Sequence, residues 1–452
     1  MKGQPVVNAQ SLIDRLPAAK FLTEPAEMEP YTVDASPAPA DGVPLAVFCP
    51  HSTEEVATAM AWANEHEVPV SIWGAGSGVA GGALAYEKGL VVALHEMNEI
   101  LEIDPASRIA RVQAGVMNED LDNAAREHNL FFAPDPASSA ISTIGGNIAT
   151  NAGGLRCIAY GNTAQAVAEL TVVLADGSVV HTGSRTMKNT TGLNLTQLFV
   201  GSEGVLGVIT EATVWLLPVP VGGAESFLAS FDSIADAGRA VVGIMSSEAQ
   251  LENLELLDAQ TAAWIEEDTN AGLPQPKAAL LMGMARGTTA AQSVDVAVGI
   301  CAAMGAVEVR REEGDAAMKP RKLAHSAQVS RGEWVFGDVG VPVPRLPELI
   351  EAIEEIEREV GIPIRHIAHA GDGNMHPSVL VVDGDREGAE RALDRITMRA
   401  LELHGVITGE HGIGKLKHHE LTHQFDDATL DLQRRIKAAL DPKGILSPGR
   451  AV

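Results

Sequence analysis

The chain has 452 residues, 46% of them hydrophobic, with 44 glycines and a formal net charge of −27 at pH 7. This length exceeds one ordinary core and predicts two or three domains, and the apolar content excludes a disordered chain. The acidic balance argues against nucleic acid and anionic membrane surfaces as partners.

The first half of the chain predicts short strands and helices around two glycine-rich stretches. A lead-in is followed by Ser52-Thr-Glu-Glu55, a capping box that predicts a helix to about residue 65. Further strands are predicted at 45–48, 68–73, 90–94, 109–114 and 206–217, a helix at 119–128, and a hairpin pairing 168–174 with 178–182 about Asp176-Gly177.

The first glycine-rich stretch, 74–82, directly follows a predicted strand. Its spacing Gly76-x-Gly78-x-x-Gly81 is that of a dinucleotide-binding turn. Such a turn must open a helix, and residues 84–89 leave no room for one before the next strand. What remains is a run of unshielded backbone N–H groups that could bind phosphate, or a glycine loop without a ligand.

The second glycine-rich stretch, 134–154, combines hydroxyl and amide side chains with four glycines. So much uncharged polar backbone requires hydrogen-bonding partners if it is buried. A large polar ligand with a planar ring is one source of such partners, and water around an exposed loop is the other.

From about residue 220 the pattern changes, after Pro218-Val-Pro220 and Gly222-Gly223. Strands alternate with long helical patterns, which predicts an α+β sheet with helices on one face. The strands are predicted at 226–231, 251–257, 278–284 and 334–341, the helices at 234–245, 290–303, 346–360 and 387–403, with further helix after Gly414.

Two histidines bracket a turn between two apolar runs, in His369-Ala-Gly-Asp-Gly-Asn-Met-His376. A straight strand would send residues seven apart to opposite faces, but the Asp-Gly and Gly-Asn steps demand a tight turn. Both imidazoles can then converge. Together with Glu410 they form a set of catalytic divalent-metal ligands with an open position. A polar hairpin with surface histidines is the alternative.

Six motifs in the same order carry a resemblance to a known family. They are Gly74-Ala-Gly-Ser-Gly78, Pro134-Asp-Pro-Ala-Ser138, Ile144-Gly-Gly-Asn147 with its continuation to Gly154, Gly201-Ser-Glu-Gly204, the 369–376 segment, and Gly409-Glu-His-Gly412. From about residue 40 to 450 the chain resembles the FAD-linked D-2-hydroxyacid dehydrogenases. These include D-lactate dehydrogenases, the flavin subunit of glycolate oxidase and D-2-hydroxyglutarate dehydrogenase, with the vanillyl-alcohol-oxidase (p-cresol methylhydroxylase, PCMH-type) fold.

The resemblance implies an α+β chain with a lead-in at 1–37, a PCMH-type FAD-binding domain at 38–219 and a cap domain with an antiparallel sheet at 220–410. A helical segment at 411–452 returns to the FAD domain. The residues that match the family's FAD site are Gly74, Ala75, Gly76, Ser77, Gly78, Pro134, Ser138, Gly145, Asn147, Ala149 and Ile209.

The same resemblance assigns the chemistry. His369, His376 and Glu410 match the family's ligands for a divalent metal, Zn²⁺ or Mn²⁺. His411 matches its catalytic base, Asn374 a residue near the flavin, and Arg321 the arginine that holds the substrate carboxylate.

The resemblance implies oxidation of a small D-2-hydroxy acid, of the D-lactate or glycolate class, to the 2-oxo acid. The glycine loop has no histidine, so FAD is expected to be non-covalent. Phe336 stands where the hydroxyglutarate enzymes align a lysine, which favours a mono-carboxylate. The alternatives are D-2-hydroxyglutarate dehydrogenase and a metal-dependent hydrolase.

The flavin requires an electron acceptor: a quinone, an electron-transfer flavoprotein or an iron–sulfur subunit. The widely spaced Cys49, Cys157 and Cys301 suit a reducing cytosol and cannot ligate an iron–sulfur cluster here. With no signal peptide or membrane span, a cytoplasmic protein is expected. Peripheral membrane association through a partner and a homodimer are compatible with the resemblance.

Overall fold

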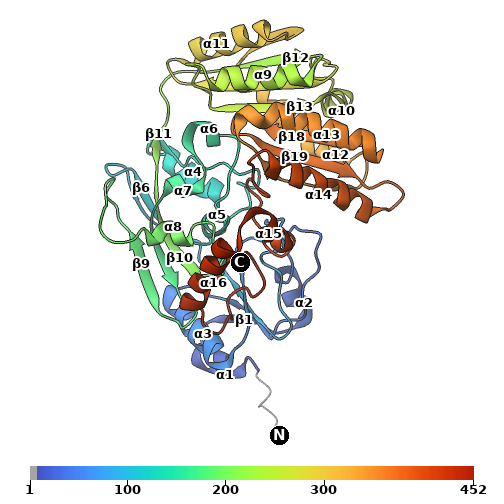
Figure 1. Cartoon of the computed structure of the whole chain (residues 1–452). Helices are drawn as coiled ribbons and strands as arrows, with labels where there is room; N and C mark the ends of the chain where they lie inside the picture. Colours follow the sequence, from blue (N-terminus) through green and yellow to red (C-terminus); the bar gives the residue numbers. More distant parts are fainter. Residues whose placement is uncertain (1–7) are drawn as a thin grey trace. The chain divides into compact units, whose positions relative to one another are not determined.

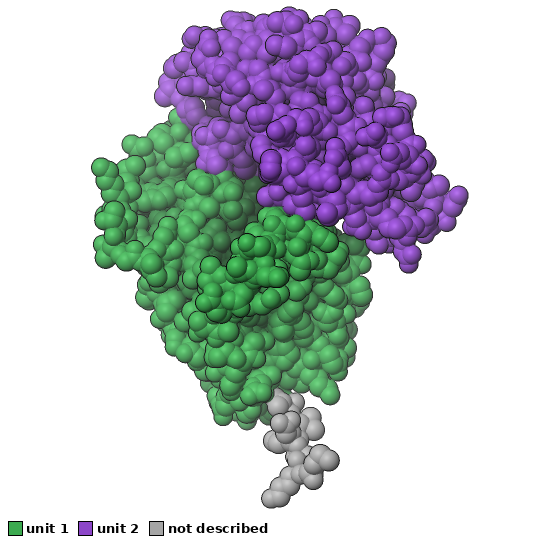
Figure 2. Space-filling model, viewed as in Figure 1, with its two compact units in different colours: residues 1–153, 162–219, 410–452 green, residues 154–161, 220–409 purple. Residues whose placement is uncertain are grey.

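The computed structural model describes residues 8–452, so the first seven residues of the predicted lead-in lie outside the described part of the chain. The chain forms two compact units (Figures 1 and 2). Unit 1 contains the described residues up to Gly153, together with Asn162–Val219 and Glu410–Val452. Unit 2 contains Gly154–Gly161 and Pro220–Gly409.

The first sheet of unit 1 has the strand order β1-β2-β4-β3. Its strands are β1 (Lys20–Leu22), β2 (Ala46–Cys49), β3 (Val70–Trp73) and β4 (Leu90–Ala93), and β4 lies parallel to both β2 and β3. Helix α3 (Thr53–His66) joins β2 to β3. Its predicted cap is present, because Ser52 Oγ accepts a hydrogen bond from the Glu55 amide at 3.2 Å.

The connection from β3 to β4 is the glycine loop. No helix forms in it, so the argument against a dinucleotide-binding turn is confirmed. Gly76 lies at φ +66°, a left-handed conformation that side chains other than glycine rarely adopt. The glycine at position 76 therefore allows the loop a backbone conformation that most other residues would not adopt.

The second sheet of unit 1 is antiparallel, in the order β5-β6-β10-β8-β9. Its strands are β5 (Ile100–Asp104), β6 (Ile109–Gln113), β8 (Val167–Val173), β9 (Val179–Gly183) and β10 (Val208–Trp215). The predicted β8–β9 hairpin is confirmed, and β5 was not predicted. Apolar residues of β6, β8 and β10 form one buried core with helix α4 (Asn118–Arg126) and helix α5 (Ile144–Thr150).

The C-terminal segment packs onto the sheets of unit 1. It contains α15 (Leu421–Gln424) and α16 (Asp427–Leu440). The Val70 amide donates to the Ile445 carbonyl at 2.8 Å, and the Ser447 amide donates to the Val70 carbonyl at 2.8 Å. The predicted return of this segment to the first domain is therefore confirmed within unit 1.

Unit 2 is built on one antiparallel sheet in the order β15-β12-β14-β13-β18-β19-β16, with β17 also paired to β19. The strands are β12 (Ala224–Phe231), β13 (Asn253–Asp258), β14 (Ala279–Arg286), β15 (Glu308–Glu313), β16 (Trp334–Phe336), β17 (Val339–Gly340), β18 (Ile364–His369) and β19 (Asn374–Leu380). The single strand predicted at 334–341 is thus two strands, interrupted at 337–338.

Helices cover both faces of this sheet, so the prediction of helices on one face is wrong. Phe227 and Phe231 of β12 share a core with helices α9 (Ile234–Met245), α11 (Ala290–Ala303), α13 (Leu346–Val360) and α14 (Arg386–Glu402). The intervening Leu228 shares a different core with α10 (Ala259–Thr269) and α12 (Lys319–Val329). Neither helix was predicted, because α10 follows β13 without a loop and α12 opens on the polar run Lys319-Pro-Arg-Lys.

The remaining short elements are α1 (Gln10–Arg15), α2 (Pro25–Met28), α6 (Cys157–Tyr160), α7 (Thr163–Ala166), α8 (Leu195–Phe199), β7 (Leu130–Phe131) and β11 (Leu217–Pro218). Across residues 8–452, no helix combines the length and the apolar character that crossing a bilayer requires.

Candidate functional site

A cavity in unit 1 is lined by the glycine loop. Gly74, Ala75, Gly76, Ser77 and Gly78 all contribute to its wall. A Cβ atom added at Gly74 would lie 2.8 Å from the Thr143 hydroxyl oxygen, too close for a side chain. Backbone amides therefore reach the cavity at this position without side chains in front of them.

Helix α5 also lines this cavity. A Cβ atom at Gly145 would lie 2.6 Å from Ala114 Cβ, so this helix can approach β6 only with glycine there. Ser138, Gly145, Asn147, Ala149 and Ile209 also line the cavity. Of the predicted flavin-site residues in the described chain, Pro134 alone is absent from the lining, and its carbonyl accepts a hydrogen bond from Asn118 Nδ2 at 3.2 Å.

Two buried polar atoms in the cavity wall have no hydrogen-bond partner among the described residues. They are Asn147 Nδ2 and Ser142 Oγ, on side chains that are 3% exposed. Buried polar groups are normally paired, so both atoms indicate a ligand that supplies hydrogen bonds. Backbone N–H groups and uncharged polar side chains fit a flavin dinucleotide, with its pyrophosphate and its planar ring.

Four ionisable residues also line this cavity: Asp34, Glu203, Glu410 and His411. The Glu203 carboxylate accepts hydrogen bonds from the amides of Ile413 at 2.8 Å and Gly414 at 2.7 Å. Burial raises the pKa of Glu203, and the two backbone hydrogen bonds lower it in part. Glu203 thereby anchors the segment that carries Glu410 and His411, a role that the sequence analysis missed.

The predicted histidine hairpin is present in unit 2. His369 ends β18 and pairs with Asn374 at the start of β19, and His376 pairs with Ile367. The centroids of the two imidazole rings lie 5.1 Å apart, with the ring planes at 88°. The tight turn predicted between the histidines is therefore confirmed, and it brings both rings together.

A buried carboxylate lies behind His369. Glu255 of β13 is 1% exposed, and its two oxygens lie 3.0 and 2.9 Å from His369 Nδ1. Arg321 of α12 donates from Nε to Glu255 Oε2 at 2.7 Å. Sequence analysis missed Glu255, although a glutamate inside the apolar run Leu254-Glu-Leu-Leu257 is a signal of a buried partner.

Asp338 is a second fully buried acid near the hairpin. Its Oδ2 accepts hydrogen bonds from Thr408 Oγ1 at 2.5 Å and from the Gly409 amide at 2.9 Å. Its Oδ1 lies 3.8 Å from His376 Nδ1. A Cβ atom at Gly409 would lie 2.2 Å from Asn374 Oδ1, so the chain passes directly against Asn374.

His325 and Phe336 flank this cluster, with their ring centroids 4.8 Å apart. Burial lowers the pKa of His325, and the charge of Arg321 lowers it further. His325 is therefore a neutral ring near pH 7, packed on an aromatic side chain.

The predicted metal ligands divide between the two units. His369 and His376 belong to unit 2, and Glu410 begins the C-terminal segment of unit 1. The three-residue set, and the roles of Arg321, Asn374 and His411, stay predictions.

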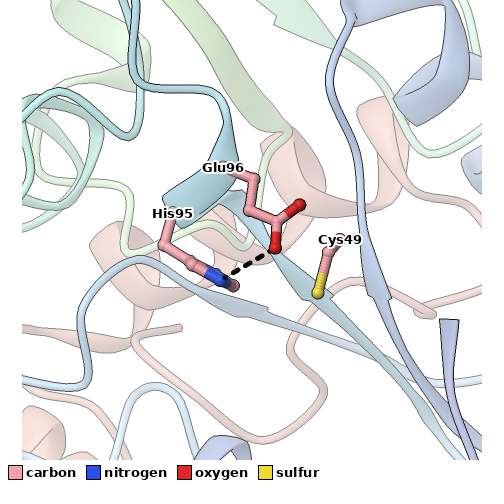
Figure 3. Close-up of side chains that lie close together, drawn as sticks. All are labelled: Cys49, His95 and Glu96. Carbon is pink, nitrogen blue, oxygen red and sulfur yellow. Dashed lines mark ion pairs between the residues drawn. The ribbon is translucent and has the colours of Figure 1, made fainter. Parts of the chain in front are cut away.

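Another group of ligand-type side chains, Cys49, His95 and Glu96, lies close together in unit 1 (Figure 3). The ammonium of Lys20 pairs with Glu96, and His51 Nε2 lies 3.4 Å from the same carboxylate. Burial raises the pKa of Cys49 to about 11, so its thiol is protonated near pH 7. A metal would have to displace both the lysine and this proton, and we therefore assign the group a structural role as an ion-pair cluster.

Comparison with known proteins places both parts of the chain in flavin-linked families. Residues 44–183 match the model of an FAD binding domain. Residues 224–451, half of the chain, match the model of the C-terminal domain of FAD linked oxidases.

Three curated relatives are similar along almost the whole chain. The glycolate oxidase subunit GlcD of Bacillus subtilis is 38% identical over 93% of this chain and 91% of its own. The D-lactate dehydrogenase of Archaeoglobus fulgidus is 34% identical over 98% and 99%. The D-2-hydroxyglutarate dehydrogenase of Xanthomonas citri is 33% identical over 97% and 96%.

Among solved structures, substrate-bound p-cresol methylhydroxylase matches with a TM-score of 0.79 at 18% identity, covering 98% of this chain and 95% of that one. At this identity the match concerns the fold, and it agrees with the predicted PCMH-type architecture. With both family models matched in order and these relatives similar end to end, the chain belongs to the FAD-linked oxidases and is an FAD-dependent oxidoreductase.

Proposed function

We propose that this oxidoreductase oxidises a small D-2-hydroxy acid to the 2-oxo acid. The observation that carries the proposal is the cluster in unit 2, where Arg321 and His369 contact one buried carboxylate and the His376 ring packs against His369. An arginine and paired histidines suit a substrate with a carboxylate beside a hydroxyl. The names of the relatives, glycolate oxidase, D-lactate dehydrogenase and D-2-hydroxyglutarate dehydrogenase, fall in this substrate class.

FAD would lie in the unit 1 cavity, with its pyrophosphate on Gly74–Gly78 and its ring near Ser138, Gly145 and Asn147. The absence of a histidine from the glycine loop supports non-covalent binding. When bound, FAD supplies the acceptor for the hydride that leaves the substrate Cα. The protein then has to bind the acid, orient it and take up the hydroxyl proton.

A divalent metal, Zn²⁺ or Mn²⁺, would be held by His369, His376 and Glu410. The donor set fits such an ion: two imidazoles with one carboxylate leave a position for substrate. A metal of this kind lowers the pKa of a hydroxyl that binds it.

Each remaining role falls to a residue of this chain. Arg321 would pair through its terminal nitrogens with the substrate carboxylate. The His411 imidazole would take the hydroxyl proton, as neutral histidine does near pH 7. Asn374 would orient the substrate beside the flavin. Loss of this proton and of the Cα hydride leaves the 2-oxo acid.

A mono-carboxylate of the D-lactate or glycolate class fits the cluster better than a diacid. Phe336 stands where the family resemblance aligns the lysine of the hydroxyglutarate enzymes, and the adjacent His325 ring, whose pKa is lowered by burial, is neutral. D-2-hydroxyglutarate is the second candidate, because one relative of similar identity carries that name.

The electrons would pass from the flavin to a quinone, an electron-transfer flavoprotein or an iron–sulfur subunit. The Bacillus subtilis relative is named as a subunit, which supports a protein acceptor.

Anaerobic bleaching of the flavin across a panel of D- and L-2-hydroxy acids tests the proposal. D-lactate or glycolate should remove the yellow colour, and one molecule of pyruvate or glyoxylate should form for each flavin that is reduced. A yellow protein that no 2-hydroxy acid bleaches contradicts the proposal.

A further inference from the structure

Glu255 is a buried acid in direct contact with two members of the proposed substrate-binding cluster, Arg321 and His369. It lies in β13 near the middle of the unit 2 sheet, where water cannot solvate its carboxylate. A buried carboxylate is tolerated only with close partners, and here the partners are a guanidinium and an imidazole. These two side chains belong to the two residues that the proposed function uses for the substrate and for the metal.

The contacts of His369 determine which of its nitrogens carries the proton. Arg321 Nη2 lies 3.4 Å from His369 Nε2, and a guanidinium can only donate hydrogen bonds. His369 Nε2 must therefore be the acceptor, so the proton of the neutral ring resides on Nδ1. From Nδ1 it is donated to Glu255, which can only accept. Both contacts thus favour one tautomer, the one whose Nε2 lone pair is suited to binding a metal.

Arg321 contacts Glu255 through Nε and not through its two terminal nitrogens, Nη1 and Nη2. Nε is the donor, so the two terminal nitrogens extend beyond the ion pair. An arginine held at Nε can turn its terminal nitrogens from His369 toward a substrate carboxylate while its inner end stays in place. The side chain is 15% exposed, which limits the other orientations available to it.

We propose that Glu255 is a positioning residue that serves both halves of the site. Its carboxylate fixes the tautomer of His369 for metal binding, and it holds the inner end of Arg321 so that the terminal nitrogens meet the substrate carboxylate. This inference rests on the proposed function, because it takes the metal role of His369 and the substrate role of Arg321 from it. Glu255 itself contacts neither metal nor substrate.

The test is Glu255→Gln, measured by metal affinity and by substrate kinetics. Glutamine keeps the shape but removes the negative charge. Both carboxylate oxygens lie within 3.0 Å of His369 Nδ1, so in either orientation the amide NH2 of glutamine would face the Nδ1–H group, donor against donor. The Kd for Zn²⁺ or Mn²⁺ is expected to rise about 10–100-fold, the range for losing the carboxylate behind a ligating histidine. The KM for D-lactate or glycolate should rise as well, whereas the FAD content should stay the same.

Glu252→Gln is the matched control. Glu252 lies just before the same strand, is 4% exposed and pairs with Arg286 Nε at 3.0 Å. Its other side-chain partners are Arg156, at 3.8 Å, and Tyr160, at 3.4 Å, not His369 or Arg321. This variant also removes a buried charge paired with arginine, so a merely structural effect would appear in both proteins. Its metal Kd and KM should match the wild type.

A second variant, Glu255→Asp, covers the case in which the glutamine protein does not fold. It keeps the charge and shortens the arm, so the metal Kd and the KM should rise in the same direction by a smaller factor. Suppose that the wild type binds metal and is bleached by substrate. If a folded Glu255 variant then has the same metal Kd and KM as the wild type, this inference is wrong and the proposed function stands. A wild type that binds neither Zn²⁺ nor Mn²⁺ overturns the metal part of the proposed function and this inference with it.

Discussion

The cavity of unit 1 and the side-chain cluster of unit 2 are built by opposite means. The cavity wall consists mainly of glycine backbone, short polar side chains and one helix that approaches β6 through Gly145. The cluster consists of long ionisable side chains, Glu255, Arg321 and the two hairpin histidines, from separate strands and a helix. The first recognises a large ligand by shape, and the second arranges charges and protons.

This difference teaches that the two activities, holding the flavin and activating the substrate, depend on separate sets of residues. A change in the side-chain cluster of unit 2 should therefore leave flavin binding intact, and a change in the cavity wall away from Glu410 and His411 should leave that cluster intact. The predictions below test that separation, from the largest expected effect to the smallest.

His376→Ala should abolish bleaching of the flavin by substrate while the flavin stays bound. The loss in rate should exceed the ~10²–10⁴-fold typical of a missing general base, because the proposed metal is lost as well. Treatment of the wild type with a chelator should have the same effect. Metal analysis, the flavin spectrum and stopped-flow bleaching measure the three properties.

The control for that variant is His411→Ala, which should keep the metal and lose turnover. If His411→Ala lost the metal while His376→Ala kept it, the proposed roles of ligand and base would be wrong.

Gly145→Ala should weaken FAD binding without affecting binding of the proposed metal. Its Cβ would meet Ala114 at 2.6 Å, and overpacking of this kind costs about 1–3 kcal/mol. If the helix yields toward the cavity, FAD affinity should fall roughly 5–150-fold, the same free energy expressed as a binding constant. Flavin retained after gel filtration reports the effect.

Gly299→Ala makes the same substitution in helix α11 of unit 2, where nothing lies within 4 Å of the new Cβ. It should leave the flavin content unchanged. Equal loss of flavin from both proteins would mean that the close contact between Gly145 and Ala114 does not determine FAD binding.

Phe336→Lys should shift the substrate preference toward D-2-hydroxyglutarate. A hydrogen bond to a charged group contributes about 1.5–3 kcal/mol, and partial exposure of this position reduces it, so a gain of about tenfold in kcat/KM is expected. A wild type that already prefers the diacid to D-lactate contradicts the proposed substrate class. Steady-state kinetics with both acids decide.

Glu96→Gln should lower the free energy of unfolding slightly, and only at pH values where Glu96 of the wild type is ionised. The hydrogen bond from Lys20 lowers the pKa of Glu96 below its unfolded value, against the opposing effect of burial. The ion pair therefore stabilises the fold above that unfolded pKa, and the stabilisation is lost as the pH falls through the folded pKa. We expect a difference of ~0.2–1 kcal/mol at pH 7 that disappears once the pH falls below the folded pKa of Glu96, measured by denaturant unfolding. A difference that grows toward acid pH would contradict this sign.

The sequence predicted the regular elements best where apolar periodicity was undisturbed. Helices α9, α11 and α13 have the predicted limits. Helices α10 and α12 were not predicted. They pack on the second face of the unit 2 sheet, and the sequence did not show that both faces of this sheet are covered by helices. Because α12 was not predicted, Arg321 was assigned from the family resemblance alone and not to any element.

The candidate site was predictable where turn chemistry is local. Glycine-rich steps specify their own backbone shape, so the loop at 74–82 and the histidine hairpin could be inferred from neighbouring residues. Glu255 and Asp338 could not, because their partners lie far away in sequence and meet them only in the folded sheet. Long-range pairing is the information that local pattern lacks.

The hydrogen bonds between Val70 and the segment around Leu446 have a consequence for biosynthesis. Strand β3 is an outer strand of its sheet, and at Val70 its outer edge is hydrogen-bonded by the segment around Leu446. At ~5–20 residues per second, the ribosome leaves that edge unpaired for on the order of tens of seconds. An exposed strand edge is a template for wrong pairing. We therefore expect chaperones to bind the nascent chain until the segment around Leu446 has been synthesised.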